Sequence, residues 1–527
     1  MSSEILDYLV VGAGPAGLQL AHDLDRAGRD YLLVEAGAAP GTFFSKYPRH
    51  RTLISINKVH TGYDDPELRM RMDWNSLLTE NPDLLFTRYS KKFLPPAEAF
   101  LRYLADFVES TGVNVRFNTR VSRISKPDDF RVELESGDEI IARRVIVATG
   151  VSLPNVPDVP GIELAEQYAD VSVDPEDFTD QKVLILGKAN SAFETADNLI
   201  ETAAVIHVAG PNPLKLAWRT HFVGHLRAAN NNLLDTYQLK LQNALLDGHV
   251  RNIERDPDGG YQVTFGFTRA QEILKDIHYD RIIVCTGFRF DASIFADDLN
   301  PELVINNRFP AQTSAWESVN IPDLYFTGTL SQMRDFKKST SGFIHGFRYC
   351  ARALQHVLDA RYEGMPWPSR EISAEPDEVM AALIERVNRS SALFQQFGFL
   401  GDLVVVDEQA GTARYYEEVP VDYVADGGFG SAASYYVATL DYGPDHDKYD
   451  PFDSTARQRI SQSETEHADE GHYLHPVVRH YRNGELAGTH HVTENLENEW
   501  TNPAVHREPL AAFIAKQSRQ RQQSRQR

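Results

Sequence analysis

A strand, glycine turn, helix and second strand near the N-terminus constrain the fold more than any other part of the sequence. The apolar run ILDYLVV (5–11) leads into GAGPAG, which is followed by the helically spaced leucines and alanines of LQLAHDLDRAG and by the run YLLVE. Gly12 and Gly14 allow a tight turn beside a pyrophosphate, and Gly17 lets the helix pack on the strand. Glu35 stands where a carboxylate accepts ribose hydroxyls. The unit predicts dinucleotide binding.

A second unit of the same kind begins at residue 182. KVLILGKANSAFETADNLI is followed by the apolar run AVIHVAG, but the glycine pattern is degenerate and reads Gly187, Ala189, Ala192. No acid closes the second strand, and Lys215 and Arg219 follow it. A site with cations and without a carboxylate favours the 2′-phosphate of NADPH over NADH. In the alternative interpretation, the two cations are only solvated surface residues.

Composition narrows the class of protein. The 527 residues carry 75 acidic and 53 basic side chains, a formal net charge of −22, which argues against nucleic acid or an anionic membrane as the main partner. Cys285 and Cys350 are far apart in sequence, so neither a disulfide framework nor a CxxC pair is present. The acidic N-terminus and the lack of a long apolar run predict a cytoplasmic protein without a membrane span. The scattered C-terminal histidines match no metal-ligand spacing, so no metal is expected.

A basic segment, KYPRHRTLISINK (46–58), is unusual in so acidic a chain. Five of its residues can carry positive charge, but it also contains the apolar Leu53, Ile54 and Ile56, so it is neither a simple solvated run nor a simple core strand. RYSKK (88–92) and RDFKK (334–338) are two further basic clusters. Either the segment is a surface loop with a strand behind it, or it borders a ligand.

Two later strands complete a family pattern. RRVIVATG (143–150) and DRIIVCTG (280–287) both end in Thr-Gly, at the strand end where ligands of α/β folds lie. Together with GAGPAG, Glu35 and the degenerate second motif, they resemble the flavin-containing monooxygenase group of flavoproteins with two dinucleotide-binding domains. PGTFFSKYPRHR resembles the flavin-proximal pattern of that group.

A closer resemblance is to the FAD-dependent oxidoreductase-domain-containing flavoproteins of the animal endoplasmic reticulum, and it extends over nearly the whole chain. It is carried by KYPRHRTLISINK, DWNSLL, THFVGHLRAANNNLLDTYQLK, CTGFRFDASIF, SGFIHGFRY and HPVVRHY. The monooxygenase signature FxGxxxHxxxY is only echoed. Gly161 is present, Val159 and Ala165 replace its aromatic residue and histidine, and Tyr168 is one residue out of register.

The motifs and the resemblance predict an α/β fold with two Rossmann-like domains and a C-terminal α+β region. We expect an FAD-binding domain in two parts, 1–155 and 288–365, around an inserted NADPH-binding domain, 156–287. PDLYFTG (322–328) and a helix over SGFIHGFRYCARALQHVLDA belong to the second FAD-binding part. Residues 366–515 form the C-terminal region, with a hairpin about Gly411, and 516–527 is a low-complexity basic tail that we expect to be disordered.

The resemblance implies FAD and NADPH as cofactors. The residues expected to bind FAD are Gly12, Gly14, Pro15, Ala16, Gly17, Glu35, Ala36, Phe44, His50, Val121, Thr149, Gly150, Gly328 and Phe343. The residues expected to bind NADPH are Gly187, Ala189, Asn190, Ser191, Lys215, Arg219, Thr286 and Gly287.

The implied activity is that of a flavin-dependent monooxygenase that uses NADPH and O₂ and acts through a flavin C4a-(hydro)peroxide. The resemblance places Asn57 at the flavin edge, with Lys58 beside it. Arg49 and Arg51 are expected to hold a small anionic substrate, which favours N-hydroxylation of a polar or acidic amine such as an aspartate-like amino acid. In the equally open alternative, the cations of the basic segment pair with local carboxylates or with the cofactors.

Other functions stay open at this point. The chain could be an NADPH oxidase or reductase with another acceptor, a sulfide- or ketone-oxidising monooxygenase, or a scaffold whose C-terminal region binds a protein. A disulfide reductase needs two neighbouring thiols near the flavin, and Cys285 and Cys350 do not form such a motif. The sequence leaves homo-oligomerisation open.

Overall fold

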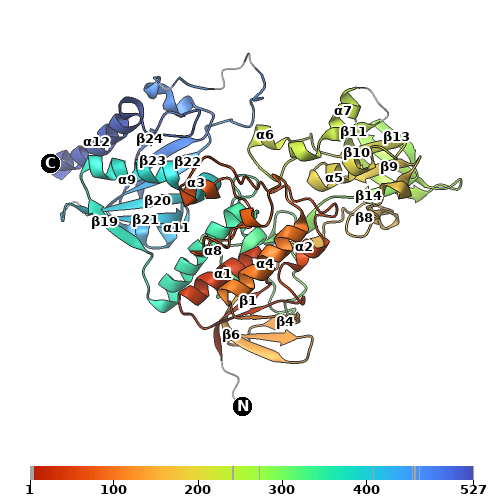
Figure 1. Ribbon diagram of the computed structural model, residues 1–527, viewed down its shortest axis with the longest axis horizontal. Coiled ribbons are helices and arrows are strands. Elements are labelled where there is room, and N and C mark those ends of the chain that lie inside the picture. Colours follow the sequence, from red (N-terminus) through yellow and green to blue (C-terminus); the bar gives the residue numbers. More distant parts are fainter. Residues whose placement is uncertain are drawn as a thin grey trace.

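The computed structural model describes residues 5–239, 243–271, 273–407, 409–453, 455, 459–461 and 463–525. Three units, each built on one main sheet, follow one another across the molecule (Figure 1). The first unit lies in the middle, the second unit, yellow to green, lies on one side, and the C-terminal unit, in blue, lies on the other.

The first unit contains a seven-stranded sheet with the order β3-β2-β1-β6-β5-β4, and β18 also pairs with β6. Its strands are β1 (Leu6–Val11), β2 (Tyr31–Val34), β3 (Val115–Arg116), β4 (Val121–Ser125), β5 (Phe130–Leu134), β6 (Glu139–Val147) and β18 (Leu324–Phe326). Its helices are α1 (Pro15–Arg26), α2 (Thr42–Lys46), α3 (Pro66–Met70), α4 (Ala97–Thr111) and α8 (Ile344–Leu358). β1 runs parallel to both β2 and β6.

The alternation of side chains along β1 builds a core on each face of this sheet. Tyr8 and Val10 join a cluster that includes buried residues of α1, α4 and α8. Leu9 and Val11 join a second cluster with residues of β4, β5 and β18. A strand with helices on one face and further apolar residues on the other reads as a continuous apolar run, as LDYLVV does.

The second unit has the sheet order β13-β12-β11-β10-β9-β14-β8. Its strands are β8 (Glu166–Gln167), β9 (Lys182–Leu186), β10 (Val205–Gly210), β11 (Ala244–Arg255), β12 (Tyr261–Phe267), β13 (Ile273–Tyr279) and β14 (Arg281–Val284), and its helices are α5 (Asn190–Leu199), α6 (Ala217–Thr220) and α7 (Asn232–Gln238). β14, β9, β10 and β11 pair in parallel. The parallel parts of both sheets therefore have the strand–helix–strand form of a dinucleotide-binding domain.

The C-terminal unit is an antiparallel sheet with the order β19-β21-β20-β22-β23-β24. Its strands are β19 (Ser369–Ser373), β20 (Leu400–Asp407), β21 (Thr412–Pro420), β22 (Ser434–Asp441), β23 (His475–Arg482) and β24 (Glu485–His491), and its helices are α9 (Pro376–Arg389), α10 (Ser391–Gln395), α11 (Tyr423–Asp426) and α12 (Glu508–Arg525). β20 and β21 are the predicted hairpin, with Gly411 at a φ of 69°. The predicted fold class, two Rossmann-like domains and an α+β region, is confirmed.

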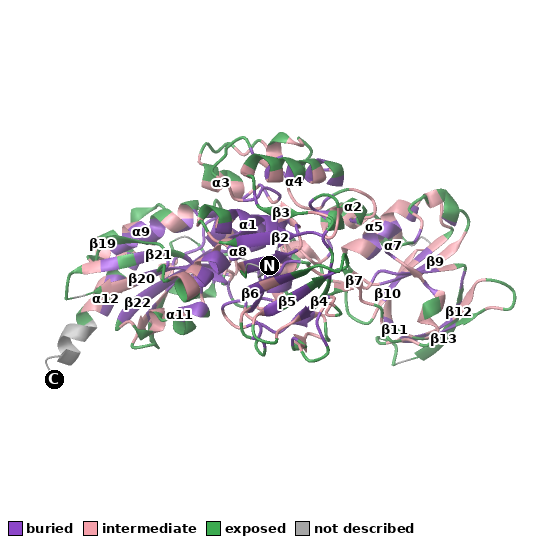
Figure 2. Cartoon of the chain, turned by 90° about the horizontal axis from the view of Figure 1, so that it is seen from below, coloured by how far each residue is buried: buried purple, intermediate pink, exposed green. Residues whose placement is uncertain are grey.

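The C-terminal unit shares its core with the first unit. Leu400, Leu403 and Val437 belong to the same buried cluster as the residues of α1, α4 and α8. α1 and α8 are accordingly among the most deeply buried elements (Figure 2). The two units therefore form one packed body.

The basic tail differs from the expectation of disorder. α12 continues from Glu508 to Arg525, and residues 526–527 lie outside the described part of the chain. Gln517 is buried, its side chain is hydrogen-bonded to His480, and its carbonyl accepts a bond from Arg482. These contacts hold Gln517, at the start of the predicted tail, against β23. Among the described residues, no helix is both long and apolar enough to cross a membrane.

Candidate active site

The first candidate site lies where parallel strands of the first unit end side by side. Gly12 follows β1, Glu35 follows β2, Thr149 and Gly150 come shortly after β6, and Gly328 comes shortly after β18. The N-terminus of α1, with Gly14 as its N-cap and Pro15 as its first residue, points to the same edge. Backbone N–H groups at such a helix start bind phosphate.

The glycines of this turn have the geometry that a dinucleotide needs. Gly12 has a φ of 106°, and a Cβ at Gly17 would stand 2.0 Å from the carbonyl oxygen of Gly12. A Cβ at Gly14, in contrast, would meet no described atom within 4 Å. The turn is thus tightly packed on the strand side and open on the side where a pyrophosphate would lie. The residues fit FAD.

Glu35 fixes the turn from the end of β2. Its buried carboxylate accepts hydrogen bonds of 2.8 Å each from the backbone N–H groups of Ala13 and Gly37 and from the Thr42 hydroxyl. Oε1 accepts two of these bonds and Oε2 only one, so Oε2 can still accept a bond from a ribose hydroxyl. Val121 was expected to contact the cofactor, but its side chain lies in the core.

Three further residues predicted for FAD, Gly328, Ala36 and Phe44, lie near this edge. A Cβ at Gly328 would come within 2.6 Å of the Cβ of Ala16, so a glycine there lets the loop after β18 touch α1. Ala36 follows Glu35 directly, and Phe44 packs edge-on against Phe100 at 4.8 Å. Burial, together with the charge of Arg49, lowers the pKa of His50 to about 4, so this imidazole is neutral at physiological pH.

A second candidate site, a cleft of about 910 Å³, lies between the two dinucleotide-binding units. Seven predicted residues line it: Gly187, Ala189, Ser191, Lys215, Thr286, Gly287 and Phe343. Gly187 has a φ of 125°, and a Cβ there would stand 2.2 Å from the Cys285 carbonyl oxygen. Ala189 is the N-cap of α5. The cleft therefore brings the second glycine turn together with the start of α8, and it fits NADPH.

Two residues predicted for NADPH have other contacts. Asn190 holds the loop after α6, because its amide donates to the carbonyl of His225 at 2.8 Å and accepts from the Arg227 N–H at 2.9 Å. Arg219 is exposed, does not line the cleft, and donates to the carbonyls of Asp447 and Lys448 at 3.2 and 3.0 Å. The expectation that Arg219 holds the 2′-phosphate is corrected by this orientation, because the guanidinium points to the C-terminal unit.

Two cations from the first unit, Arg308 and Lys337, line the cleft instead. Arg308 lies so close to Gly287 that a Cβ there would stand 3.5 Å from its Nη2, and Lys337 lines the same cleft. Burial and the charges of Arg308 and Lys215 lower the pKa of Lys337, which shows that the three cations converge. Within the described chain, none of the three forms an ion pair. Sequence reasoning missed Arg308, because it lies outside every motif.

The basic segment joins the first unit to the second. Lys46 pairs with Asp170 at 3.1 Å, Arg49 donates to the Val171 carbonyl at 2.6 Å, and Tyr47 stacks on Tyr168 at 5.9 Å. Arg51 pairs with Glu98 at 2.7 Å and donates to the Phe44 carbonyl. These contacts favour the alternative in which the cations pair locally.

Asn57 and Lys58 are not among the residues that line the cleft. Asn57 is buried, and its amide donates to the carbonyls of Ser90 and Lys92 at 2.6 and 3.1 Å, whereas Lys58 is exposed. The neighbouring motif DWNSLL reaches the start of α8, where Trp74 stacks on the buried His345 with ring centres 4.1 Å apart. Neither ring nitrogen of His345 has a hydrogen-bond partner among the described residues.

Comparison with known proteins shows the family of the chain. The profile of the pyridine nucleotide-disulphide oxidoreductase family matches residues 9–328. The chain is 37% identical to the FAD-dependent oxidoreductase domain-containing protein 2 of Mus musculus, over 96% of this chain and 83% of that protein.

Solved structures show the fold of the first two units. A flavin monooxygenase from Stenotrophomonas maltophilia, in a mutant form, matches with a TM-score of 0.53 and 21% identity, over 68% of this chain and 99% of that one. The ornithine N-hydroxylase of Kutzneria sp. 744 matches with a TM-score of 0.50 and 16% identity, over 68% and 100%. The predicted cofactors, FAD and NADPH, are confirmed. The chain belongs to the pyridine nucleotide-disulphide oxidoreductase family and is a flavin-dependent enzyme related to flavin monooxygenases.

Proposed function

We propose that the protein is an FAD- and NADPH-dependent monooxygenase that N-hydroxylates a small polar or acidic amine. The observation that carries the proposal is the cleft of about 910 Å³, which is lined by the second glycine turn and by the start of α8. A nucleotide held at Gly187 can extend along this cleft toward the flavin-binding unit.

The chain positions the reactants and excludes water, and bound FAD supplies hydride acceptance from NADPH and activation of O₂. Aromatic side chains surround the start of α8. Phe222 contacts Phe343 at 5.7 Å, and Phe343 stacks on His345 at 5.9 Å. A shell of this kind keeps bulk water away from reactive oxygen species.

A dithiol mechanism finds no support in this chain, despite the family's name. Cys285 directly follows β14 and Cys350 lies within α8, and both are buried and unbridged. Burial raises the pKa of both thiols to about 12, so neither is a thiolate at neutral pH. Monooxygenation needs no protein thiol.

Nitrogen oxidation is supported by two observations. One solved neighbour is named as an ornithine N-hydroxylase. The cleft also presents Lys215, Arg308 and Lys337, which have no carboxylate partner among the described residues, in a chain of net charge −22. Such cations favour anionic ligands. Part of this charge serves the phosphates of NADPH, and the rest is available to a substrate carboxylate.

The test is NADPH turnover by the FAD-loaded enzyme with acidic amino acids, basic amino acids, sulfides and ketones. We expect NADPH oxidation to be coupled to an amine product 16 mass units heavier, measured by mass spectrometry. Stoichiometric H₂O₂ with every candidate amine would instead identify an oxidase, and efficient oxygenation of sulfides or ketones alone would move the activity to another substrate class.

A further inference from the structure

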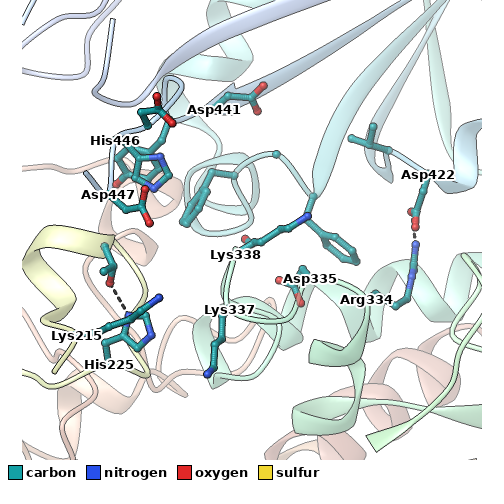
Figure 3. A pocket seen from close by; sticks show the side chains of 18 residues that line it. Lys215, His225, Arg334, Asp335, Lys337, Lys338, Asp422, Asp441, His446 and Asp447 are labelled. Atoms are coloured by element: carbon teal, nitrogen blue, oxygen red, sulfur yellow. Dashed lines mark hydrogen bonds and ion pairs between the residues drawn. The ribbon is translucent and has the colours of Figure 1, made fainter. Parts of the chain in front are cut away.

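A second cavity, of about 690 Å³, lies where all three units meet (Figure 3). The second unit contributes Lys215, Thr220 and His225, and the first unit contributes residues 334–335 and 337–339. The C-terminal unit contributes 397–399, 421–422, 441–442 and 445–447. The C-terminal unit therefore forms one wall of a cavity that is large enough for a ligand.

The cavity adjoins the cofactor cleft. Lys215, His225 and Lys337 line both spaces. A ligand in the second cavity therefore lies next to a nucleotide in the cleft without occupying the glycine turn. That is the relation expected between the substrate and the cofactor of one enzyme.

Charges of both signs line the cavity. Figure 3 shows Lys215 and Lys337 on one side and Asp441 on the other, while Asp335 lies beside Lys337 and Lys338. Lys338 lines this cavity but not the cleft, and in the described chain it has no ion-pair partner. A ligand that carries both an anionic and a cationic group would match this pattern.

Buried polar atoms at the cavity also lack partners. Asp335 is 5% exposed, and its Oδ2 accepts a bond from the Ser341 N–H at 3.3 Å, but its Oδ1 has no hydrogen-bond partner among the described residues. The same holds for Nη1 of Arg334, which pairs with Asp422 through Nη2, and for Oδ1 of Asp441, which pairs with Arg479 through Oδ2 at 2.6 Å. Unsatisfied buried polar atoms are rare in folded proteins, and a ligand bound in the cavity would supply partners for these atoms.

We propose that this cavity binds the amine substrate as a zwitterion of amino-acid to dipeptide size. The carboxylate is held by Lys337 and Lys338, and the nitrogen donates to Asp335 and Asp441. The inference rests on the proposed function in taking the ligand as the substrate. It assigns substrate binding to the C-terminal unit, which contributes Asp441 and neighbouring residues to the lining of the cavity.

Calorimetric titration of the oxidised FAD-loaded enzyme, without NADPH, tests the site. The probes are L-aspartate and L-aspartyl-L-lysine, with succinate, which has no amine, and 1,5-diaminopentane, which has no carboxylate. We expect the two zwitterionic probes to bind, and Lys338→Gln and Asp441→Asn each to raise their Kd at least tenfold. NADPH affinity should stay unchanged in both variants. Lys275→Gln, on the exposed side of β13, is the matched control.

Three results would overturn the site. They are no binding of either zwitterion to the wild type, equal binding of succinate or 1,5-diaminopentane, and an unchanged Kd in both Lys338→Gln and Asp441→Asn. The test separates the site from the activity. Zwitterion binding without an oxygenated product contradicts only the proposed function, whereas N-hydroxylation that neither variant affects contradicts only the site. Thermal unfolding of each variant checks that the fold is retained.

Discussion

Gly14 is the residue at which the FAD site can be tested most directly. Its φ of −73° suits any residue, and the space beside it is open, so a larger side chain costs little folding stability. Gly14→Glu, however, places a negative charge where the cofactor phosphates bind the helix N-terminus. We expect the purified variant to be folded and colourless, with Gly14→Ala as a yellow control. Stoichiometric FAD in folded Gly14→Glu, measured by absorbance, would contradict the assignment.

Arg308 and Arg219 form a matched pair for the NADPH site. Arg308 approaches Gly287 in the cleft, whereas Arg219 donates to the backbone of the C-terminal unit. A hydrogen bond to a charged group contributes about 1.5–3 kcal/mol, so Arg308→Gln should raise the Kd for NADPH roughly tenfold or more. Arg219→Gln should leave it within about twofold. The reverse order, measured by titration, would restore the assignment made from sequence.

At the scale of elements, the sequence predicts what local pattern determines. The strand and helix around GAGPAG, the second unit at 182 and the hairpin about Gly411 follow from apolar periodicity and glycine positions. The position of Arg308 does not follow, because it depends on a loop of one unit crossing to the glycine edge of another. The local pairing of Arg51 with Glu98 likewise depends on how α4 packs, which no motif records.

Helix α8, helix α9 and strand β21 are joined by buried charges. Glu418 pairs with Arg352 and, at 3.4 Å, with Arg386, which also contacts Asp402 at 3.0 Å. Removing one partner of a buried ion pair costs about 3–5 kcal/mol, because it leaves a charge uncompensated. Glu418→Gln should therefore lower the free energy of unfolding by about that amount in urea titrations. Glu371→Gln, on the exposed side of β19, should have almost no effect.

Glu418 also determines how the stability of the fold changes with pH. Burial opposes ionisation of Glu418, but Arg352 and Arg386 outweigh it and hold its pKa below the ordinary value of 4.5. A carboxyl with a lowered folded pKa stabilises the fold fully above its unfolded pKa, and this stabilisation is lost as the pH falls through the folded pKa. The wild type should therefore lose its advantage over Glu418→Gln below about pH 4.5. An advantage that grows on acidification would contradict this arrangement.

For the whole molecule, the distribution of cores predicts how the protein unfolds. One cluster joins residues of α1 and α8 to Leu400 and Val437 of the C-terminal unit, whereas two other clusters lie almost entirely within the second unit. The second unit is joined to the others by a few polar contacts, such as Lys46 with Asp170, and by aromatic contacts, Tyr47 with Tyr168 and Phe222 with Phe343. Elements that share a core unfold together, and elements joined by a few exposed contacts separate first.

Scanning calorimetry should accordingly resolve two transitions, one for the second unit and one for the first and C-terminal units together. A ligand at 100 times its Kd stabilises the unit that binds it by about 2.7 kcal/mol, which raises a Tm by several degrees. FAD should therefore raise the Tm of the transition that includes the first and C-terminal units. NADP⁺ should raise the Tm of the second unit's transition more strongly. Fluorescence of the buried Trp500 would report which transition contains the C-terminal unit. If Trp500 responds in a third transition that FAD does not shift, the shared core does not couple the two units.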